Sequence, residues 1–561
     1  MSWERAGQAE AMMTRESGNF SLQGNIVDLV RDRIFPGTIT VAAGRIVEVR
    51  EDNGNYQQVI MPGLVDSHVH IESSMLPPAE FARLAMVHGT VAAVADPHEI
   101  ANVLGMAGID FMAASAANSP FCFHFGAPSC VPATPFETAG AELDLERIEE
   151  LLADGRCGFL SEMMNFPGVL AAEPQVMAKI ALARRLGKVV DGHAPGLLGE
   201  AARRYVDAGI GTDHECRDQA EALAKIRLGM KILIREGSAA RDFEILAPLI
   251  ADHAEMLMFC SDDKHPDDLI RGHINQLVAR AVAMGLAPLK VLRCACLNPV
   301  KHYGLDLGLL QPGDRADFIV VDELSSMQVR QTYLGGRLCA EAGQPLLAHA
   351  APEVVNRFAA RPLRENDLRV LPEAGRLRVM GAVDGQLVTS SLLMAPTIVN
   401  GEVVADPGRD LLKLVVVNRY QPALPAVAFI QGFGLRQGAI ASSVAHDCHN
   451  IVAVGASDEA LCRAINSVIA EQGGICAKGP DFVEVLPLPI AGLMTTMDGY
   501  QAARAYTAID ARAKELGSRL TAPFMTLSFM ALLVIPSLKL SDRGLFDGND
   551  FNFVGLFDGA D

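Results

Sequence analysis

The sequence predicts an α/β fold, a (β/α)8 barrel of the TIM type followed by an additional C-terminal α+β domain. Three observations lead to this prediction. The chain has 561 residues, more than the roughly 250 that one hydrophobic core usually serves. Its first half alternates short apolar runs of β type with amphipathic helical patterns. Polar residues gather at the ends of the apolar runs, where a barrel of this type builds its active site.

Eight strand candidates are spaced along the first half of the chain, at residues 63–70, 90–96, 121–127, 157–164, 188–193, 209–214, 231–236 and 256–263. Four stretches between them carry apolar residues three and four positions apart and end on Gly, the pattern of amphipathic helices. These are residues 78–89, 145–155, 174–187 and 219–229. Eight such units between about Gly63 and Tyr303 fit a barrel of the usual size. A doubly wound open sheet is the structural alternative, but it does not explain the polar strand ends.

From about residue 367 the pattern changes and predicts a separate domain. Apolar β-rich runs occupy residues 411–420, 426–434 and 450–457, and helical patterns occupy residues 457–472 and 499–516. The long apolar stretch from Ala522 to Leu538 is interrupted by Pro523 and Pro536 and is shorter than the roughly 20 residues that span a bilayer. We expect it to belong to the core of this domain.

The composition argues against several classes of partner. A formal charge of −19 at pH 7 repels phosphate backbones and anionic lipids, so neither nucleic acid nor a membrane is expected as a partner. The first 20 residues carry charges where a signal peptide needs an apolar centre. We therefore expect residues 1–20 to be disordered and the chain to stay in the cytoplasm.

Two histidines at the end of the first strand candidate are the first sign of a metal site. His68 and His70 are two positions apart, so in a strand both imidazoles point to the same side. Neutral imidazole nitrogens bind zinc, manganese or iron. Alone the pair says little, because most histidines in proteins are hydrogen-bonded residues of the core or the surface.

Three further strand candidates end in residues that bind metals, and a fourth carries one near its end. The residues are Glu162 on the fourth strand, His193 on the fifth, His214 on the sixth, and Asp262 with Asp263 on the eighth. Each one taken alone is equally well explained as a solvated loop residue. Together they supply enough ligands for two metal ions bridged by a carboxylate, whereas a single ion would leave a polar group buried without a partner.

The segment from Met61 to His70, MPGLVDSHVH, resembles the first-strand signature of the metal-dependent amidohydrolase superfamily. Residues 298–323 resemble the superfamily's exit from the barrel, where the chain returns to a small β-domain begun before it. Within the superfamily, the chain resembles the adenine deaminase family from about Asn25 to Phe546. The segments that carry this resemblance are residues 68–76, 95–105, 161–169, 191–197, 211–215, 260–266, 443–455, 486–494 and 524–547.

The resemblance implies a domain organisation. A small β-domain would consist of residues 21–61 and 304–362, and the catalytic barrel of residues 62–303. The C-terminal α+β domain, a candidate lid over the barrel mouth, would consist of residues 367–561. The resemblance also implies a homo-oligomer, with a dimer favoured, whose substrate is a small purine base.

The resemblance further implies an aminohydrolase that converts adenine to hypoxanthine and ammonia in purine salvage. A binuclear centre of divalent ions, with manganese favoured over iron or zinc, would hold the hydroxide that attacks C6 of the purine. Its ligands would be His68, His70 and Asp262 for the first ion, His193 and His214 for the second, and Glu162 as the bridge. Many superfamily members bridge with a carboxylated lysine, and the fourth strand candidate contains no lysine. Asp262 would take the proton of the hydroxide and pass it to the leaving nitrogen.

Several further polar residues near the strand ends are candidates for catalysis or substrate binding. His98 and Glu99 would shuttle protons or bind the purine edge, or would only start a helix. Candidates for substrate binding or support are Glu215, Arg235, Ser238, Asp263, His446 and His449. Glu215 would orient a metal ligand or be an ordinary solvated glutamate. Asp263 alternates with Asp262 and should face away from the centre.

A second polar cluster lies in the C-terminal domain. In a strand, His446 and Cys448 would face one way and Asp447 and His449 the other. The cluster would bind an extra metal ion, close over the substrate, or simply be hydrogen-bonded in a turn.

Two other classes of function remain as alternatives. One is a different amidohydrolase, acting on a cyclic amide or another aminopurine, and the other is a catalytically silent assembly protein. A silent protein would lack metal ligands, but all six are present. A cyclic-amide hydrolase would favour a lysine on the fourth strand, where this chain has Glu162. A two-metal deaminase therefore remains the leading hypothesis.

Overall fold

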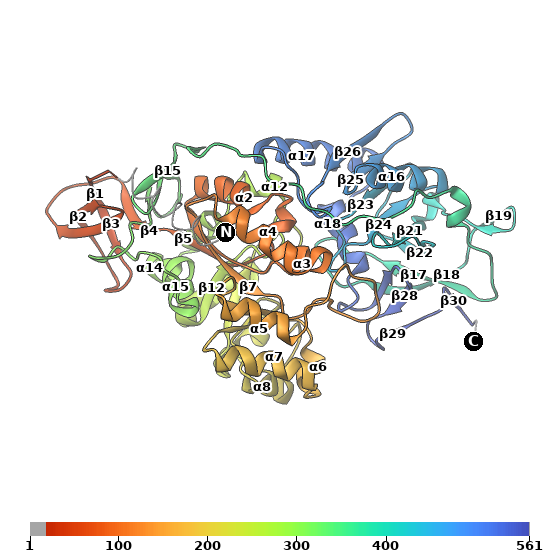
Figure 1. Cartoon of the computed structure of the whole chain (residues 1–561), viewed down its shortest axis with the longest axis horizontal. Coiled ribbons are helices and arrows are strands. Elements are labelled where there is room, and N and C mark those ends of the chain that lie inside the picture. The colour runs from red at the N-terminus through yellow and green to blue at the C-terminus, as the bar shows by residue number, and fades with distance from the viewer. Residues whose placement is uncertain (1–17, 560–561) are drawn as a thin grey trace.

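The computed structural model describes residues 18–559 (Figure 1). Disorder is predicted for residues 1–20, and most of this prediction concerns residues 1–17, which lie outside the described range. Figure 1 shows three parts across the long axis of the molecule: a sheet at one end, a barrel in the middle and a larger lobe at the other end.

Eight parallel strands form the barrel, in two hydrogen-bonded sheets of order β5-β6-β7-β8-β9 and β10-β11-β12. Their bounds are β5 Leu64–Val69, β6 Thr90–Ala95, β7 Cys122–Ala127, β8 Phe159–Met163, β9 Val190–Gly192, β10 Thr212–Asp213, β11 Lys231–Arg235 and β12 Leu257–Cys260. Each strand lies inside one of the eight predicted segments, so the predicted strands are confirmed.

Two short seams join the two sheets. Between β12 and β5, the amide of Asp262 donates to the carbonyl of His68, and the amide of His70 donates to the carbonyl of Asp262, both at 2.9 Å. Between β9 and β10, the amide of Gly211 donates to the carbonyl of Val190 at 2.9 Å. The sheets therefore form a barrel of the TIM type and not an open sheet, which confirms the predicted fold class.

The four predicted barrel helices are present as α2 Pro78–Ala85, α5 Leu145–Ala153, α7 Pro174–Arg185 and α9 Gln219–Arg227. Local sequence sets where two of them begin. The side chain of Asp144 accepts from the amide of Arg147 at 3.0 Å before α5, and Asp218 caps α9 in the same way. The other barrel helices are α3 His98–Leu104, α4 Met106–Ala116, α6 Phe166–Leu170, α8 Gly199–Asp207, α10 Phe243–Leu246, α11 Ile250–His253, α12 Pro266–Leu269, α13 Ile274–Ala283, α14 Pro288–Leu292 and α15 Asn298–Tyr303.

An eight-stranded sheet of order β16-β15-β14-β13-β4-β1-β2-β3 flanks the barrel. Its strands are β1 Phe20–Asp28, β2 Arg33–Ala42, β3 Arg45–Glu51, β4 Val59–Pro62, β13 Phe318–Val321, β14 Val329–Leu334, β15 Arg337–Glu341 and β16 Gln344–Pro345. β4 runs into the first barrel strand, β5. β13 pairs antiparallel with β4, with Phe318 opposite Pro62. The chain thus leaves this sheet, builds the barrel and returns. The predicted domain limits stay a prediction.

The C-terminal lobe is built on a sheet of order β18-β17-β22-β21-β24-β23-β25-β26, with β30 paired to β17. Its strands are β17 Arg376–Gly381, β18 Ser390–Met394, β21 Leu412–Val417, β22 Ala426–Gln431, β23 Ala439–Ser442, β24 Ile451–Gly455, β25 Gly474–Lys478, β26 Val483–Pro487 and β30 Phe557–Asp558. Its main helices are α16 Asp458–Ala470 and α17 Gly499–Glu515. The three β-rich runs and two helices predicted here are confirmed.

The apolar stretch from Ala522 to Leu538 lies inside this lobe. It forms the short helix α18, Pro523–Ser528, a single turn at Phe529–Ala531, and the first residue of β27, Leu538–Ser541. Most of its side chains are buried, as expected for a core segment. Among residues 18–559, no helix is both long and apolar enough to cross a lipid bilayer.

A buried polar contact joins the barrel to the C-terminal lobe. The carboxylate of Glu80 in α2 accepts from the amide of Gly499, the first residue of α17, at 2.8 Å. The same carboxylate lies 2.8 Å from Nδ1 of His349, which belongs to the segment that runs from the first sheet to the lobe (Figure 1). Arg83 pairs with Glu80 and, at 2.8 Å, with Asp498. The carboxylate of Glu80 therefore connects the barrel, the segment around His349 and the C-terminal lobe.

Glu80→Gln is expected to lower the stability of the protein by about 1–3 kcal/mol, because Arg83 and His349 lose a buried charged partner. Differential scanning calorimetry measures this as a lower Tm. The matched control is Glu149→Gln, since Glu149 also pairs with an arginine, Arg185, but their side chains are 54% and 66% exposed. The control should shift stability by less than about 0.5 kcal/mol. Equal shifts in the two variants would contradict the prediction.

Candidate metal centre

Six buried side chains meet at the carboxyl ends of the barrel strands. They are His68, His70, Glu162, His193, His214 and Asp262. All parallel strands of a barrel end on the same side, so residues far apart in sequence come together there. The structure brings together all six residues that the sequence analysis selected.

Glu162 lies in the middle of the group, and its two oxygens face different histidines. Oε1 lies 3.2 Å from Nε2 of His70 and 3.9 Å from Nε2 of His68. Oε2 lies 2.8 Å from Nδ1 of His193 and 3.3 Å from Nε2 of His214. A carboxylate that bridges two metal ions needs this division between two sets of ligands.

Asp262 contacts the first pair of histidines. Its Oδ1 lies 3.3 Å from Nε2 of both His68 and His70, and its Oδ2 accepts from Nη1 of Arg235 at 3.0 Å. Asp262 has a φ of 52°, in the left-handed region that Asp and Asn tolerate better than most residues. With this backbone conformation the residue completes the barrel seam while its carboxylate reaches both imidazoles.

The hydrogen bonding of His70 fits a metal ion at the centre. Its Nδ1 lies 3.1 Å from the carbonyl oxygen of Asp96, and since a carbonyl only accepts, this nitrogen carries a proton. In the neutral ring, the lone pair of Nε2 then faces oxygens of Glu162 and Asp262, at 3.2 and 3.3 Å. Such an arrangement is repulsive unless a metal ion or a proton lies between them. Burial lowers the pKa of His70, but the carboxylates of Asp262 and Glu162 raise it well above its usual value, so a positive charge is favoured at this position. A set of imidazoles and carboxylates suits manganese, iron or zinc.

The two central carboxylates are ionised. Burial alone would raise the pKa of Glu162, but the imidazoles of His193 and His214 hold this pKa well below its usual range. Burial alone would also raise the pKa of Asp262. The neighbouring imidazoles, that of His68 first, instead hold this pKa well below its usual range. Metal ligands must be deprotonated, so both residues are ready to bind.

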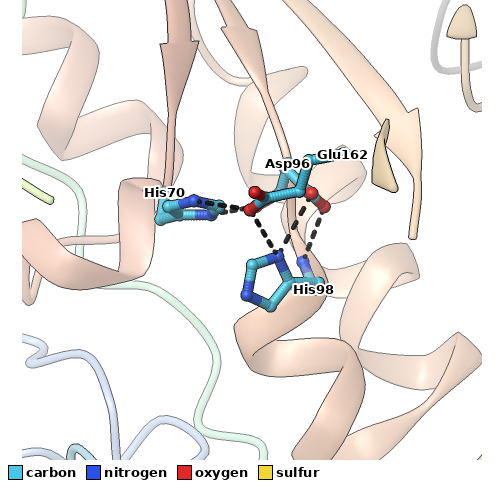
Figure 2. A group of neighbouring side chains, drawn as sticks. All are labelled: His70, Asp96, His98 and Glu162. Carbon is cyan, nitrogen blue, oxygen red and sulfur yellow. Dashed lines mark hydrogen bonds and ion pairs between the residues drawn. The ribbon is translucent and has the colours of Figure 1, made fainter. Parts of the chain in front are cut away.

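A second, overlapping group of ligand atoms lies beside β6. Figure 2 shows His70 and His98 turned toward the carboxylates of Glu162 and Asp96. Nδ1 of His98 lies 3.1 Å from Oδ2 of Asp96 and 3.6 Å from Oε1 of Glu162. One ligand atom from each of these four buried residues lies within 4.8 Å of the others. Asp96 is not among the residues predicted from sequence, although it directly follows its strand as several of the predicted ligands do.

Arg235 ends β11 and contacts three carboxylates. Its guanidinium donates to Glu215 at 3.1 Å and to Asp242 at 3.1 Å, in addition to Asp262. Glu215 also lies 3.9 Å from Nδ1 of His193. It is buried, so the alternative of an ordinary solvated glutamate is wrong. Arg235 therefore fixes the orientation of Glu215 and Asp262 on this side of the centre.

Ser238 and Asp263 lie nearby, with partners of their own. The hydroxyl of Ser238 donates to Oδ2 of Asp268 at 2.6 Å and accepts from the amide of His265 at 2.9 Å. The hydroxyl of Ser73 donates to Oδ1 of Asp263 at 2.5 Å. The roles expected for Ser238 and Asp263 in substrate binding or support stay predictions.

The C-terminal lobe reaches the barrel mouth through one turn. Glu99, in the first turn of α3, contacts Nδ1 of His446 and Nε2 of His449. Its Oε1 also lies 3.4 Å from Nε2 of His98. Of the alternatives considered for this cluster, the structure shows a turn: residues 446–448 lie in a turn between β23 and β24, so the alternation of a strand does not apply. His446 and His449 therefore contact the same carboxylate instead of facing opposite ways.

Comparisons with known proteins agree with this geometry. A family model described as "Amidohydrolase family" matches residues 59–339, and one described as "Adenine deaminase C-terminal domain" matches residues 386–552. The adenine deaminase of Salinibacter ruber is 54% identical over 541 residues, which cover 96% of this chain and 99% of that protein. The adenine deaminases of a Sulfurovum species and Methanosarcina mazei are 51% and 50% identical, each covering 95% of this chain and 99% of their own. The similarity therefore spans both the barrel and the C-terminal lobe.

Proposed function

The chain belongs to the adenine deaminase family of amidohydrolases, and from this premise we propose how its residues carry out the reaction. The enzyme is a hydrolase acting on a C–N bond, and its reaction is the hydrolytic deamination of adenine to hypoxanthine and ammonia. The observation that carries this conclusion is the 54% identity to an adenine deaminase over nearly the full length of both chains.

The centre would hold two divalent metal ions. The first would be held by His68, His70 and Asp262, the second by His193 and His214, and Glu162 would bridge them. The position of Glu162 between the two histidine sets supports this assignment. When bound, the two cations lower the pKa of water and so supply a nucleophile at neutral pH. We favour manganese, with iron and zinc as the alternatives.

Asp262 is the proposed proton acceptor. Its carboxylate is ionised, and Arg235 holds Oδ2 at 3.0 Å so that Oδ1 stays beside the imidazoles. From there it takes a proton from the attacking water and returns it to the leaving amino group. His98 and Glu99 form a second path for protons, since Nε2 of His98 lies 3.4 Å from Oε1 of Glu99 and its Nδ1 faces Glu162.

The C-terminal lobe is the proposed lid of the barrel. The contacts of Glu99 with His446 and His449 support this role, because they tie the lobe to the barrel mouth. A lid over a metal centre excludes bulk water and helps to position a small substrate. We further propose a cytoplasmic homo-oligomer, with a dimer favoured, that works in purine salvage. Light scattering tests the oligomer, and a particle with the mass of one chain would overturn it.

The proposed function is tested with purified, manganese-loaded protein and adenine. Ammonia and hypoxanthine are expected to appear in equal amounts as adenine is consumed. A panel of cyclic amides and other aminopurines serves as the comparison. Absence of adenine turnover, together with hydrolysis of a cyclic amide, would replace this proposal with the alternative amidohydrolase.

Removal of the metal by a chelator is expected to lower the rate of adenine deamination by more than about 100-fold, because the nucleophile depends on the bound ions. Adding back manganese should restore the rate once two ions are bound per chain, as counted by elemental analysis. Full activity with fewer than one ion per chain would contradict the binuclear centre.

A further inference from the structure

Several buried polar atoms at the barrel mouth have no hydrogen-bond partner in the described part of the chain. They belong to His68, Glu72, Asp96, His98, His446 and Asp447. Those of His68, Asp96 and His98 lie at the metal centre. Nε2 of His446 and Oδ2 of Asp447 come from the C-terminal lobe, and the centre does not use them. Buried polar atoms without a partner destabilise a fold, so each of them needs a partner that the chain itself does not supply, such as a polar ligand or an ordered water.

His446 is held on three sides. Its Nδ1 contacts Glu99, and its ring stacks on Phe529 with 4.7 Å between centroids and 15° between planes. Its backbone amide donates to the carbonyl of Ser528 at 3.1 Å. Since Nδ1 faces the carboxylate, Nε2 is the free edge of the ring. The residue is only 2% exposed, so this free edge does not meet bulk solvent.

His449 fixes Glu99 from the other side. Its Nδ1 accepts from the amide of Ala445 at 3.1 Å, so the neutral ring carries its proton on Nε2, which donates to Glu99. Both nitrogens of His449 are therefore in use, which argues against a further metal ion on this residue. The turn orients Glu99 and, through it, His446.

The turn presents a donor and an acceptor on adjacent residues. Burial lowers the pKa of His446, but the carboxylates of Glu99, Asp263 and Asp447 outweigh burial and raise it to about 9. At neutral pH the ring therefore carries both protons, and Nε2 is a donor. Asp447 has one oxygen, Oδ1, 3.7 Å from Nε2 of His98, and its other oxygen, Oδ2, is a free acceptor.

We propose that His446 and Asp447 bind the edge of the purine that lies away from C6, an inference that rests on the proposed function. On that edge adenine carries the acceptor N3 beside the donor N9–H. Nε2 of His446 donates to N3, and Oδ2 of Asp447 accepts from N9–H. C6 must lie at the metal centre in the barrel, so the opposite edge faces the lobe. A substituent on N9 removes the donor, so this pair selects free bases over nucleosides.

The test uses two variants that separate the two nitrogens of His446. In His446→Asn the amide stands in for Nδ1 and keeps the contact with Glu99, but nothing replaces Nε2. In His446→Gln the amide reaches the position of Nε2 and restores the donor. His349→Asn is the matched control. His349 also pairs through Nδ1 with a barrel glutamate, Glu80, at 2.8 Å, but this pair lies at the contact between α2 and the C-terminal lobe.

Binding of the product hypoxanthine to the metal-loaded enzyme is measured by calorimetry. It should weaken by roughly 10- to 100-fold in His446→Asn, recover in His446→Gln, and change by less than about 2-fold in His349→Asn. For adenine, kcat/KM should fall by the same factor in His446→Asn, mainly through KM. For 3-deazaadenine, which lacks the N3 acceptor, wild type and His446→Asn should give the same kcat/KM.

Unchanged hypoxanthine binding in His446→Asn, or equal losses on adenine and 3-deazaadenine, would overturn the assignment of His446. Asp447→Ala tests the second contact and should narrow the preference for adenine over 9-methyladenine. An unchanged preference would remove Asp447 from the pocket. Metal content equal to wild type shows that the variants act on the base and not on the centre. If the wild-type enzyme does not deaminate adenine at all, the proposed function fails instead.

Discussion

Glu162→Gln is expected to reduce adenine deamination by about 10³-fold or more and to lower the metal content of the purified protein. A neutral amide cannot bridge two cations. Oε1 of Glu162 faces His70 at 3.2 Å and Oε2 faces His193 at 2.8 Å, so either orientation of the amide turns its NH2 group toward ligand nitrogens. Elemental analysis and an ammonia assay on the same preparation measure both effects.

Glu80→Gln is the matched control for this experiment. Glu80 is also a buried glutamate in contact with an imidazole, that of His349, but it lies at the contact between α2 and the C-terminal lobe. At temperatures where it stays folded, this variant should keep both metal ions and at least about half of the wild-type rate. Metal content and activity equal to wild type in Glu162→Gln would remove the bridging role.

Asp262→Asn is expected to lower kcat by on the order of 10³- to 10⁴-fold, since it removes both a proposed metal ligand and the proposed proton acceptor. Asn tolerates the φ of 52° at this position, so the barrel seam should survive and the circular dichroism spectrum should not change. The pKa of Asp262 lies well below its usual range, so the wild-type carboxylate is ionised throughout the working range. The amide of the Asp262→Asn variant has no proton to lose in this range, so raising the pH should not recover its lost activity.

Asp263→Asn provides the comparison at the next residue. The carboxylate of Asp263 accepts from Ser73 and is not among the contacts of His68 or His70. This variant should retain activity within about 10-fold of wild type. A kcat in Asp262→Asn above about one tenth of the wild-type value would contradict the role of Asp262 as proton acceptor.

The barrel could be predicted from sequence because its geometry leaves a strong local pattern. All six residues of β6, Thr90–Ala95, are buried, and after Thr90 the strand is a continuous apolar run. Asp96 then follows at the point where the strand reaches the mouth. This pattern recurs at most of the strands, and the six candidate metal ligands could be selected because residues of ligand type recur near the ends of several strands, although none of them is decisive alone.

His98 and Glu99 show where a local pattern is ambiguous. Their sequence is compatible with a helix start and with a place in the site. The structure shows the helix start and brings both side chains to the barrel mouth, while their role in the reaction stays a prediction. α3 begins at His98, and the same two side chains face the centre and the C-terminal turn. A helix whose first turn lies at a barrel mouth can supply polar residues to the site, so the two readings do not compete.

The contact between the barrel and the C-terminal turn could not be predicted from sequence. Glu99 and His446 are 347 positions apart. The spacing of apolar residues predicts helices and strands, but it does not predict which loop of the C-terminal lobe contacts which strand end of the barrel. At residues 446–449 the sequence left a strand and a turn as alternatives, because four mostly polar residues between two strands have no alternation set by a buried face. Sequence indicated that this cluster matters but not what it contacts.

Glu99 and His446 are 347 positions apart, so the ribosome makes His446 well after Glu99. At roughly 5–20 residues per second, a ribosome needs roughly 20–70 s to make that length of chain. A nascent chain that has just completed the barrel already contains all six candidate metal ligands, but the turn with His446 and Asp447 does not yet exist. On the proposed roles, the residues for the metal ions would therefore be made well before the residues that select the substrate.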